Sequence, residues 1–258
     1  MPKPEWYDEQ QQGPWAQLTG VFQNTAPGAE DHIDNMDGEQ ALFLFAVPGA
    51  GVFLDANAVD WSGVPPAEPF GAVYEPFKAY ELTVGLIGGG YGMLEGVPLT
   101  LQLYYLSETG EHVPVAATEV IYSQDVFPAS RTHFIDFSVR TPTIWPDSPA
   151  AGRPIGIALI STVPFELAGG FWDVDNVRLR EVTGPRIAHP AVIGDQFTFD
   201  VVGEPETIYR VLAAPTPDAP SGQWQTVIEL TTDPEGRASF SETLAGQRGR
   251  FYRLEQAL

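Results

Sequence analysis

Two aspartates in one apolar stretch are the residues whose spacing most directly suggests chemistry. The stretch that begins at Phe171 alternates as a strand does, and its odd positions include the apolar Val177 and Leu179. That parity places Asp173 and Asp175 on the same, core-facing side. A buried carboxylate is costly unless it is paired, hydrogen-bonded or bound to a metal. Both aspartates are therefore expected to have a partner.

A second group of carboxylates lies early in the chain, just before an apolar run. Asp31, Asp34, Asp37 and Glu39 crowd one short loop, and calcium prefers carboxylate and carbonyl oxygens gathered in this way. The loop is not an EF-hand, because aligning Gly38 with the glycine of that motif leaves two ligand positions apolar. A cation here would take its other ligands from elsewhere in the fold, and a charged turn is the equal alternative.

Signatures of the common enzyme classes are absent from the sequence. It has no Gly-x-Ser-x-Gly elbow, no phosphate-binding loop and no His-Glu-x-x-His zinc helix. Its four histidines are scattered, with no pair at metal-ligand spacing. The glycine-rich stretch 85–96 is followed by a strand where a dinucleotide-binding loop would begin a helix. We therefore predict that the protein is not an enzyme.

Composition excludes several kinds of partner. The 13 Lys and Arg against 34 Asp and Glu give a formal net charge of −21, which repels nucleic acids and anionic membranes. Such a charge suits divalent cations or neutral, hydroxyl-rich molecules. Cysteine is absent, which excludes disulfides and thiolate metal sites. No stretch approaches the roughly 20 apolar residues of a membrane span.

The elements that must position these residues are almost all strands. Residues 98–106 alternate with Leu99, Leu101 and Leu103 on one face, as a half-buried strand does. Similar alternation recurs along the chain, and the 26 Gly and 24 Pro interrupt any long helix. The pattern predicts an all-β protein built as an antiparallel β-sandwich. Further strands are expected within 40–47, 79–89, 132–141, 153–163, 197–201, 207–214, 223–230, 237–243 and 248–255.

The end of the apolar stretch, Asp175-Asn176-Val177-Arg178-Leu179, carries a family resemblance. Together with an early apolar strand after the acidic loop, it resembles the galactose-binding-like jelly roll, whose members often close on Asp-Asn-Val-x-Leu. Many are non-catalytic carbohydrate-binding modules of secreted bacterial proteins. The resemblance implies a structural calcium held by Asp175 together with Asp34, Asp37 or Glu39. Failing calcium, backbone amides and an arginine would hold Asp175, while Asp173 would lie at the water-accessible beginning of the strand.

Candidate sugar-binding residues follow from chemistry, because the family's sugar sites vary in position. Exposed aromatic rings stack on the apolar faces of sugars, and neighbouring polar groups bind hydroxyls. Trp61 and Trp145 each lie in a loop with Pro and Asp, and Tyr91 lies on a glycine loop. Tyr104 beside Gln102 is expected on an outer sheet face. Packing beneath a loop is the alternative for each ring.

The C-terminal part resembles small β domains that end secreted proteins of environmental bacteria. The shared features are a tyrosine strand, a tryptophan after a turn and a closing Arg-Phe-Tyr-Arg. Trp224 and Phe251 are predicted to be core residues, and Arg250 and Arg253 to hold carboxylates or turn carbonyls. The expected organisation is an N-terminal arm over 1–17, a jelly-roll β-sandwich over 18–183, a linker over 184–192 and a small β-sandwich over 193–258.

These patterns favour a non-catalytic, extracellular or cell-surface protein that binds a polysaccharide or glycan and carries a structural calcium. The chain would be the mature form of a secreted protein behind a start Met. The alternative is a structural protein that self-associates into a surface layer or fibre, with the N-terminal arm docking on a neighbour. A polysaccharide lyase or hydrolase on a sandwich scaffold is the third hypothesis.

Overall fold

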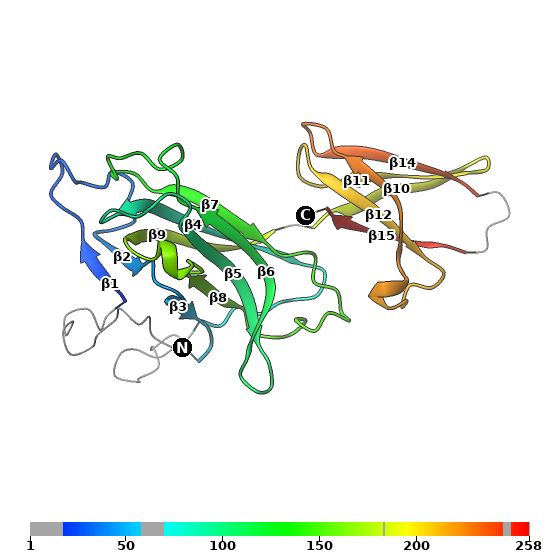
Figure 1. The fold of residues 1–258 in the computed structure, drawn as a ribbon. Helices are drawn as coiled ribbons and strands as arrows, with labels where there is room; N and C mark the ends of the chain where they lie inside the picture. The colour runs from blue at the N-terminus through cyan, green and yellow to red at the C-terminus, as the bar shows by residue number, and fades with distance from the viewer. Residues whose placement is uncertain (1–17, 58–69, 183, 245–248, 258) are drawn as a thin grey trace. The chain divides into compact units, whose positions relative to one another are not determined.

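The computed structural model describes residues 18–57, 70–182, 184–244 and 249–257 of the chain. These residues form strands joined by loops and two 3₁₀ turns, Phe165–Leu167 and Ser221–Gln223 (Figure 1). The predicted all-β class is therefore confirmed. None of the helices in the described part of the chain is long and apolar enough to cross a membrane. The predicted arm over 1–17 lies outside the described residues.

The chain divides into two compact units, and neither follows one continuous stretch of sequence. Among the described residues, unit 1 takes those within Met1–Val73, Glu81–Thr141 and Arg153–Arg180. Unit 2 takes those within Tyr74–Tyr80, Pro142–Gly152 and Glu181–Leu258. Two short segments from the middle of the sequence thus belong to the compact unit that contains the C-terminal strands.

Unit 1 is an antiparallel β-sandwich of a five-stranded sheet, in the order β1-β2-β9-β4-β7, and a four-stranded sheet, in the order β3-β8-β5-β6 (Figure 1). With β1 set aside, the remaining eight strands have the order of a jelly roll. The strands are β1 (Thr19–Gln23), β2 (Gln40–Phe45), β3 (Gly51–Leu54), β4 (Ala79–Gly90), β5 (Pro98–Leu106), β6 (His112–Ile121), β7 (Ile135–Arg140), β8 (Gly156–Ile160) and β9 (Phe171–Val182).

The core of unit 1 follows the alternation of the sequence in most strands. Leu99, Leu101 and Leu103 of β5 are fully buried, as their spacing predicts. In β9, however, the buried apolar residues are the even-numbered Trp172, Val174 and Val182, with Trp172 paired to the buried Leu44 of β2. Val177 is instead exposed, so the predicted core face of this strand is wrong. Trp172 and Val174 lie opposite Leu44 and Leu42 of β2, so leucines of β2 flank them in the sheet.

Unit 2 is a smaller arrangement of two three-stranded sheets, in the orders β10-β11-β14 and β13-β12-β15. Its buried cluster comprises Phe199, Val201, Tyr209, Val211, Phe240 and Leu254. The strands are β10 (Arg186–Ile193), β11 (Gln196–Val202), β12 (Ile208–Ala214), β13 (Gln225–Thr231), β14 (Arg237–Thr243) and β15 (Phe251–Gln256).

The predicted linker over 184–192 is wrong, because most of it is strand β10. This strand pairs antiparallel with β11, with an irregularity between Ala188 and Ala191. Pro190 lies within that irregularity, where its missing N–H costs no ladder hydrogen bond. The proline that made the segment resemble a linker is thus accommodated inside an edge strand.

Candidate functional site

The closing strand of unit 1 is joined to the acidic loop by direct hydrogen bonds. The carboxylate Oδ2 of Asp175 accepts a hydrogen bond from the backbone N–H of Asp37 at 2.7 Å. The neighbouring Asn176 donates from Nδ2 to the carbonyl of Asn35 at 3.0 Å. The predicted link between the last strand and the early loop is therefore present, and a backbone amide serves as its partner.

These contacts do not build a metal centre. In the part of the chain that the structure describes, no three His, Asp or Glu side chains gather closely enough to hold an ion. Asp34, Asp37 and Glu39 are all exposed, and the Asp175 carboxylate is already engaged by an amide. The described geometry does not fit the predicted calcium site, and calcium remains a prediction for chelation to test.

Asp173 is buried, in contrast to the water-accessible position expected for it. Only 6% of its surface is exposed, and its carboxylate accepts a hydrogen bond from the guanidinium of Arg131. The same guanidinium lies over the ring of Phe171, 4.9 Å from its centroid. Burial raises the pKa of Asp173 to about 6, against the opposing effect of the Arg131 charge. This is a carboxylate held inside unit 1 by one arginine.

The sugar-binding candidates of unit 1 do not form one surface. Tyr104 and Gln102 lie on the face of β5 opposite the core leucines, but both are buried. The hydroxyl of Tyr104 donates to Asp55 at 2.7 Å, and the rings of Phe53 and His112 pack against it. The expectation that Tyr104 and Gln102 are open to a ligand is wrong, because these neighbours cover them.

The other two candidates in this unit remain untested as binding residues. Tyr91 is 81% exposed on its glycine loop, as expected, with a backbone φ of 47°. Trp61 lies outside the described residues. The described residues of unit 1 therefore offer one exposed candidate ring, that of Tyr91, while the ring of Tyr104 is buried.

Trp145 lies in unit 2, where it lines a concavity. This pocket has a volume of about 680 Å³, within the range of roughly 300–1,000 Å³ that small-molecule sites occupy. Its wall holds five aromatic rings and three prolines, with two aspartates and one arginine. The residues that argue for a ligand are Phe77, Trp145, Asp147, Asp218, Trp224, Phe251 and Arg253.

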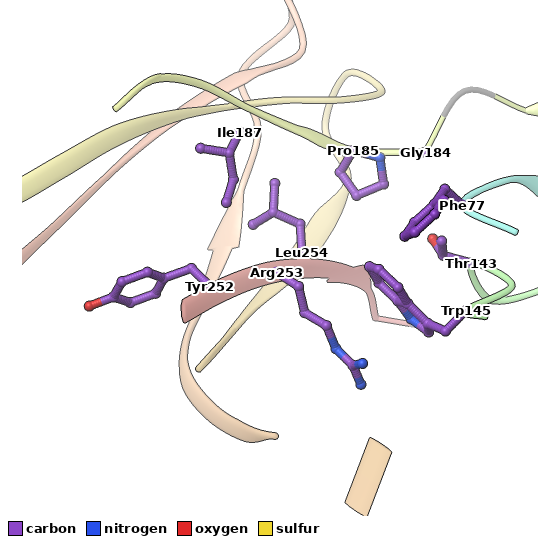
Figure 2. A pocket seen from close by; sticks show the side chains of 9 residues that line it. All are labelled: Phe77, Thr143, Trp145, Gly184, Pro185, Ile187, Tyr252, Arg253 and Leu254. Carbon is purple, nitrogen blue, oxygen red and sulfur yellow. The ribbon is translucent and has the colours of Figure 1, made fainter. Parts of the chain in front are cut away.

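A smaller pocket of about 260 Å³ shares part of this wall (Figure 2). Phe77, Trp145, Tyr252 and Arg253 line both pockets. Figure 2 shows Arg253 extending from β15 beside the indole of Trp145, while Phe77 and Trp145 come from loop segments. The two pockets therefore form a continuous set of side chains rather than separate sites.

Arg253 is the most unusual residue of this pocket. Its guanidinium lies 4.6 Å from the ring centroid of Trp145 and 4.5 Å from that of Trp224. Its Nε is buried and has no hydrogen-bond partner among the described residues. Burial lowers the pKa of Arg253, and the charges of Glu255 and Asp147 oppose this effect. An arginine stays charged in such a setting, so the pocket contains a cation between two aromatic rings.

The loops that carry these rings are held by backbone hydrogen bonds. The indole Nε1 of Trp224 donates to the carbonyl of Ala219 at 2.8 Å, which fixes the orientation of that ring. The carboxylate of Asp147 accepts from the backbone N–H of Ser221 at 3.1 Å, so the loop after Trp145 is tied to the turn before Trp224. The aromatic wall is therefore organised without a ligand.

Phe77 is presented by a strained turn. It lies at φ 67°, a conformation rare for a bulky residue, and is 64% exposed beside Trp145, with ring centroids 5.9 Å apart. In the sequence Glu75-Pro76-Phe77-Lys78-Ala79-Tyr80, the Tyr80 hydroxyl accepts a hydrogen bond from the Glu75 N–H at 2.8 Å. Tyrosine and proline thus hold the turn while its third residue faces the pocket.

Unit 2 uses the same turn a second time. In Glu204-Pro205-Glu206-Thr207-Ile208-Tyr209, the Tyr209 hydroxyl accepts from the Glu204 N–H at 2.8 Å, and Glu206 has φ 51°. The third residue is a glutamate there and does not line the pocket. The repeated device indicates that the turn itself is structural and that the exposed phenyl ring is the particular feature of the first copy.

Several pocket residues were not predicted from the sequence. Phe251, expected in the core, is 42% exposed, and Trp224 is only partly buried. Arg250 does hold the carboxylate of Glu242, as predicted, but Arg253 stacks between indoles instead. On β15 the apolar Leu254 is buried, which leaves Arg253 on the opposite side of the strand, so strand parity could have indicated that Arg253 points away from the core.

Comparisons with known proteins give only weak likenesses. No family model matches the chain, and no curated protein matches it. A cyclase from Fischerella sp. TAU is 22% identical, with 64% of this chain and 75% of that chain covered, at a TM-score of 0.43. The CBM22 tandem of Paenibacillus barcinonensis Xyn10C is 12% identical, with 92% and 89% covered, at a TM-score of 0.37. At these values the likenesses carry no argument about activity.

Proposed function

We propose that the protein is a non-catalytic glycan-binding protein whose site is the aromatic pocket of unit 2. The observation that carries this proposal is the combination of exposed rings and charged groups around a pocket of about 680 Å³. Phe77 and Phe251 expose large parts of their rings there. Covering an exposed phenyl ring with another apolar surface is favourable, so exposed rings in a pocket indicate a binding surface. A sugar ring with an apolar face is a suitable cover for such surfaces.

The polar groups of the pocket suit hydroxyl-rich ligands. The carboxylates of Asp147 and Asp218 can accept hydrogen bonds from sugar hydroxyls, and the guanidinium of Arg253 can donate to sugar oxygens. A site with both donors and acceptors around aromatic rings binds sugars with defined orientation. The ring of Trp145 lines the pocket and is proposed as one of the rings on which a sugar stacks.

The proposal is tested by calorimetric titration of the full chain with a panel of soluble polysaccharides and their oligosaccharides. We expect binding to at least one glycan, and a loss of about tenfold or more in affinity in Phe77→Ala and in Trp224→Ala. Tyr91→Ala is the matched control, since Tyr91 is exposed in the other unit and its removal should leave affinity unchanged. Binding that depends on Tyr91 but not on the pocket residues would contradict the proposed pocket and place the binding site at Tyr91 in unit 1.

The non-catalytic part of the proposal is tested separately. A binding protein leaves the glycan intact, so prolonged incubation with each bound polysaccharide should release no new reducing ends and no unsaturated products. Release of either product in the wild type, and its loss in Asp147→Asn or Asp218→Asn, would make the pocket a catalytic site instead.

Self-association is the second proposed function, and a specific observation supports it. Strand β10 is an edge of its sheet, and its last residues Val192 and Ile193 are both more than half exposed. An edge strand with exposed apolar side chains invites pairing with another copy. Sedimentation over a wide concentration range should then show oligomers that Val192→Lys abolishes, whereas a monomer at all concentrations would contradict this function.

A further inference from the structure

We infer that the pocket of unit 2 selects acidic glycans, with Arg253 as the partner of a uronic acid carboxylate. This inference rests on the proposed function and specifies the class of glycan. It begins from the surroundings of the guanidinium, which lies over two indoles and whose buried Nε has no hydrogen-bond partner in the described chain.

The stacking limits where Arg253 can find a partner. A guanidinium is planar, and its N–H groups point outward in that plane. The rings of Trp145 and Trp224 both lie within 4.6 Å of Arg253 Cζ and occupy part of the space around the guanidinium. A hydrogen-bond acceptor must therefore approach the N–H edge, and the larger pocket is the space that Arg253 lines.

Arg253 offers one local positive charge to a ligand carboxylate, opposed by Asp147 and Asp218 of the same pocket and by the net charge of −21. Two other arginines of unit 2 are matched by carboxylates: Arg250 pairs with Glu242, and Arg210 with Glu229 at 2.9 Å. Arg186 and Arg237 have no such pair among the described residues but are exposed to water, whereas Arg253 is partly buried without one. A cation left without a carboxylate in so acidic a chain is suited to one supplied by a ligand.

A uronic acid matches the shape of this site. Its carboxylate is planar and can accept two parallel N–H bonds from a guanidinium edge, a geometry that strengthens and orients the contact. Its sugar ring can lie against Phe77 or Phe251, the exposed rings of the same pocket. Its hydroxyls can donate hydrogen bonds to the carboxylates of Asp147 and Asp218. These two aspartates would then contact the hydroxyls of the ligand, while Arg253 contacts its carboxylate.

The test compares oligosaccharides that differ only at the carboxyl group. Calorimetric titration of the full chain would use oligomers of galacturonate, glucuronate and mannuronate, each beside its carboxyl-reduced neutral counterpart. We expect at least one acidic oligomer to bind about tenfold or more tightly than its neutral counterpart, the factor typical of a charge-assisted hydrogen-bonded pair.

Variants assign the difference to Arg253. In Arg253→Gln the preference for the acidic oligomer should vanish, so that the acidic and neutral oligomers bind with equal affinity. Arg253→Lys, which keeps the charge but not the planar fork, should retain only part of the preference. Arg237→Gln makes the same change of charge at an exposed position of β14 outside both pockets, and should leave the preference intact. Thermal melts of all variants would establish that each is folded.

The outcomes separate this inference from the proposed function. Binding of neutral oligomers as tightly as acidic ones, or tighter binding of a sulfated derivative of the carboxyl-reduced oligomer, would overturn the selection of uronic acids and leave glycan binding in place. An acidic preference unchanged in Arg253→Gln would also overturn the role of Arg253. If no oligosaccharide of either kind binds, both the inference and the proposed function fail.

Discussion

Arg131 in unit 1 and Arg253 in unit 2 both lie against aromatic rings, yet they differ in what faces their N–H groups. Arg131 lies over Phe171 and donates to the buried carboxylate of Asp173. Arg253 lies between Trp145 and Trp224 and has no carboxylate of the described chain as a partner. The comparison suggests that the first arginine serves the fold and that the second is available to a ligand.

The largest expected effect concerns removal of these two side chains in turn. Arg131→Met leaves Asp173 buried without its cation and should lower the free energy of unfolding by about 3–5 kcal/mol at pH 7. Arg253→Met leaves no buried carboxylate behind and loses mainly its contacts with two rings, at about 1 kcal/mol. Urea denaturation of both variants checks the difference. Equal losses would break the comparison, because Arg253 would then be as structural as Arg131.

The pH dependence of stability should show the same contrast. The pKa of Asp173 rises from 3.8 to about 6 on folding, so between these values the folded chain holds a proton that the unfolded chain has released. The stability from this proton is fully present below pH 3.8 and lost as pH rises through about 6. The loss amounts to about 3 kcal/mol. In urea denaturation from pH 3.5 to 7, the stability difference between wild type and Asp173→Asn should follow this curve.

Arg253→Gln is the control for that curve. Its stability difference from wild type should stay flat across the same range, because no carboxylate of the described chain pairs with Arg253. A flat difference for Asp173→Asn as well would mean that Asp173 stays ionised in the fold, and the pH contrast between the two arginines would disappear.

The contacts of the two arginines also show which features can be predicted from the sequence and which cannot. Strand alternation predicts the β-sandwich and its buried leucines, because period-two burial is a local property of each strand. It does not predict that Asp173 meets Arg131, since that contact joins residues 42 apart in the chain. Parity failed in β9 itself, where the even-numbered Trp172 is fully buried and the odd-numbered Val177 is exposed, although Asp173 is buried as well.

The pocket was still harder to predict. Trp145 was identified from its loop, but its partners come from three separate parts of the chain, around Phe77, Trp224 and Arg253. Their convergence depends on the grouping of the short segments 74–80 and 142–152 with the C-terminal strands, which no local pattern encodes. Strand β10 was missed for the opposite reason. Pro190 is a strong local indication of a linker, but an edge strand can accommodate a proline at an irregularity of its pairing.

Asp175 extends the comparison to carboxylates that are held within the fold. Its hydrogen bond from the Asp37 N–H is charge-assisted, and Asp175→Ala should cost about 1–2 kcal/mol in a denaturation curve. The cost should be the same with chelator and with added calcium, whereas Asp34→Ala should change stability by less than about 0.5 kcal/mol. A cost that appears only with calcium present would instead support the predicted metal site.

The smallest expected effect tests whether Phe77, a pocket residue, is kept in its turn at a cost in stability. Phe77 and Glu206 occupy the same position of the two Glu-Pro turns, with φ of 67° and 51°. Glycine adopts these angles without strain but loses more entropy on folding, so each substitution should change stability by at most about 1 kcal/mol, in the stabilising direction. Thermal melts and denaturation curves of Phe77→Gly and Glu206→Gly measure this effect.

Binding should separate the two glycine variants where stability does not. Phe77→Gly removes an exposed ring from the pocket and should weaken glycan binding, whereas Glu206→Gly changes a residue outside the pocket and should not. Equal affinities in calorimetry would mean that Phe77 is merely tolerated in its turn. A loss of affinity confined to Phe77→Gly, at unchanged or higher stability, would indicate that the strained phenyl ring serves to bind the ligand of the pocket that Arg253 lines.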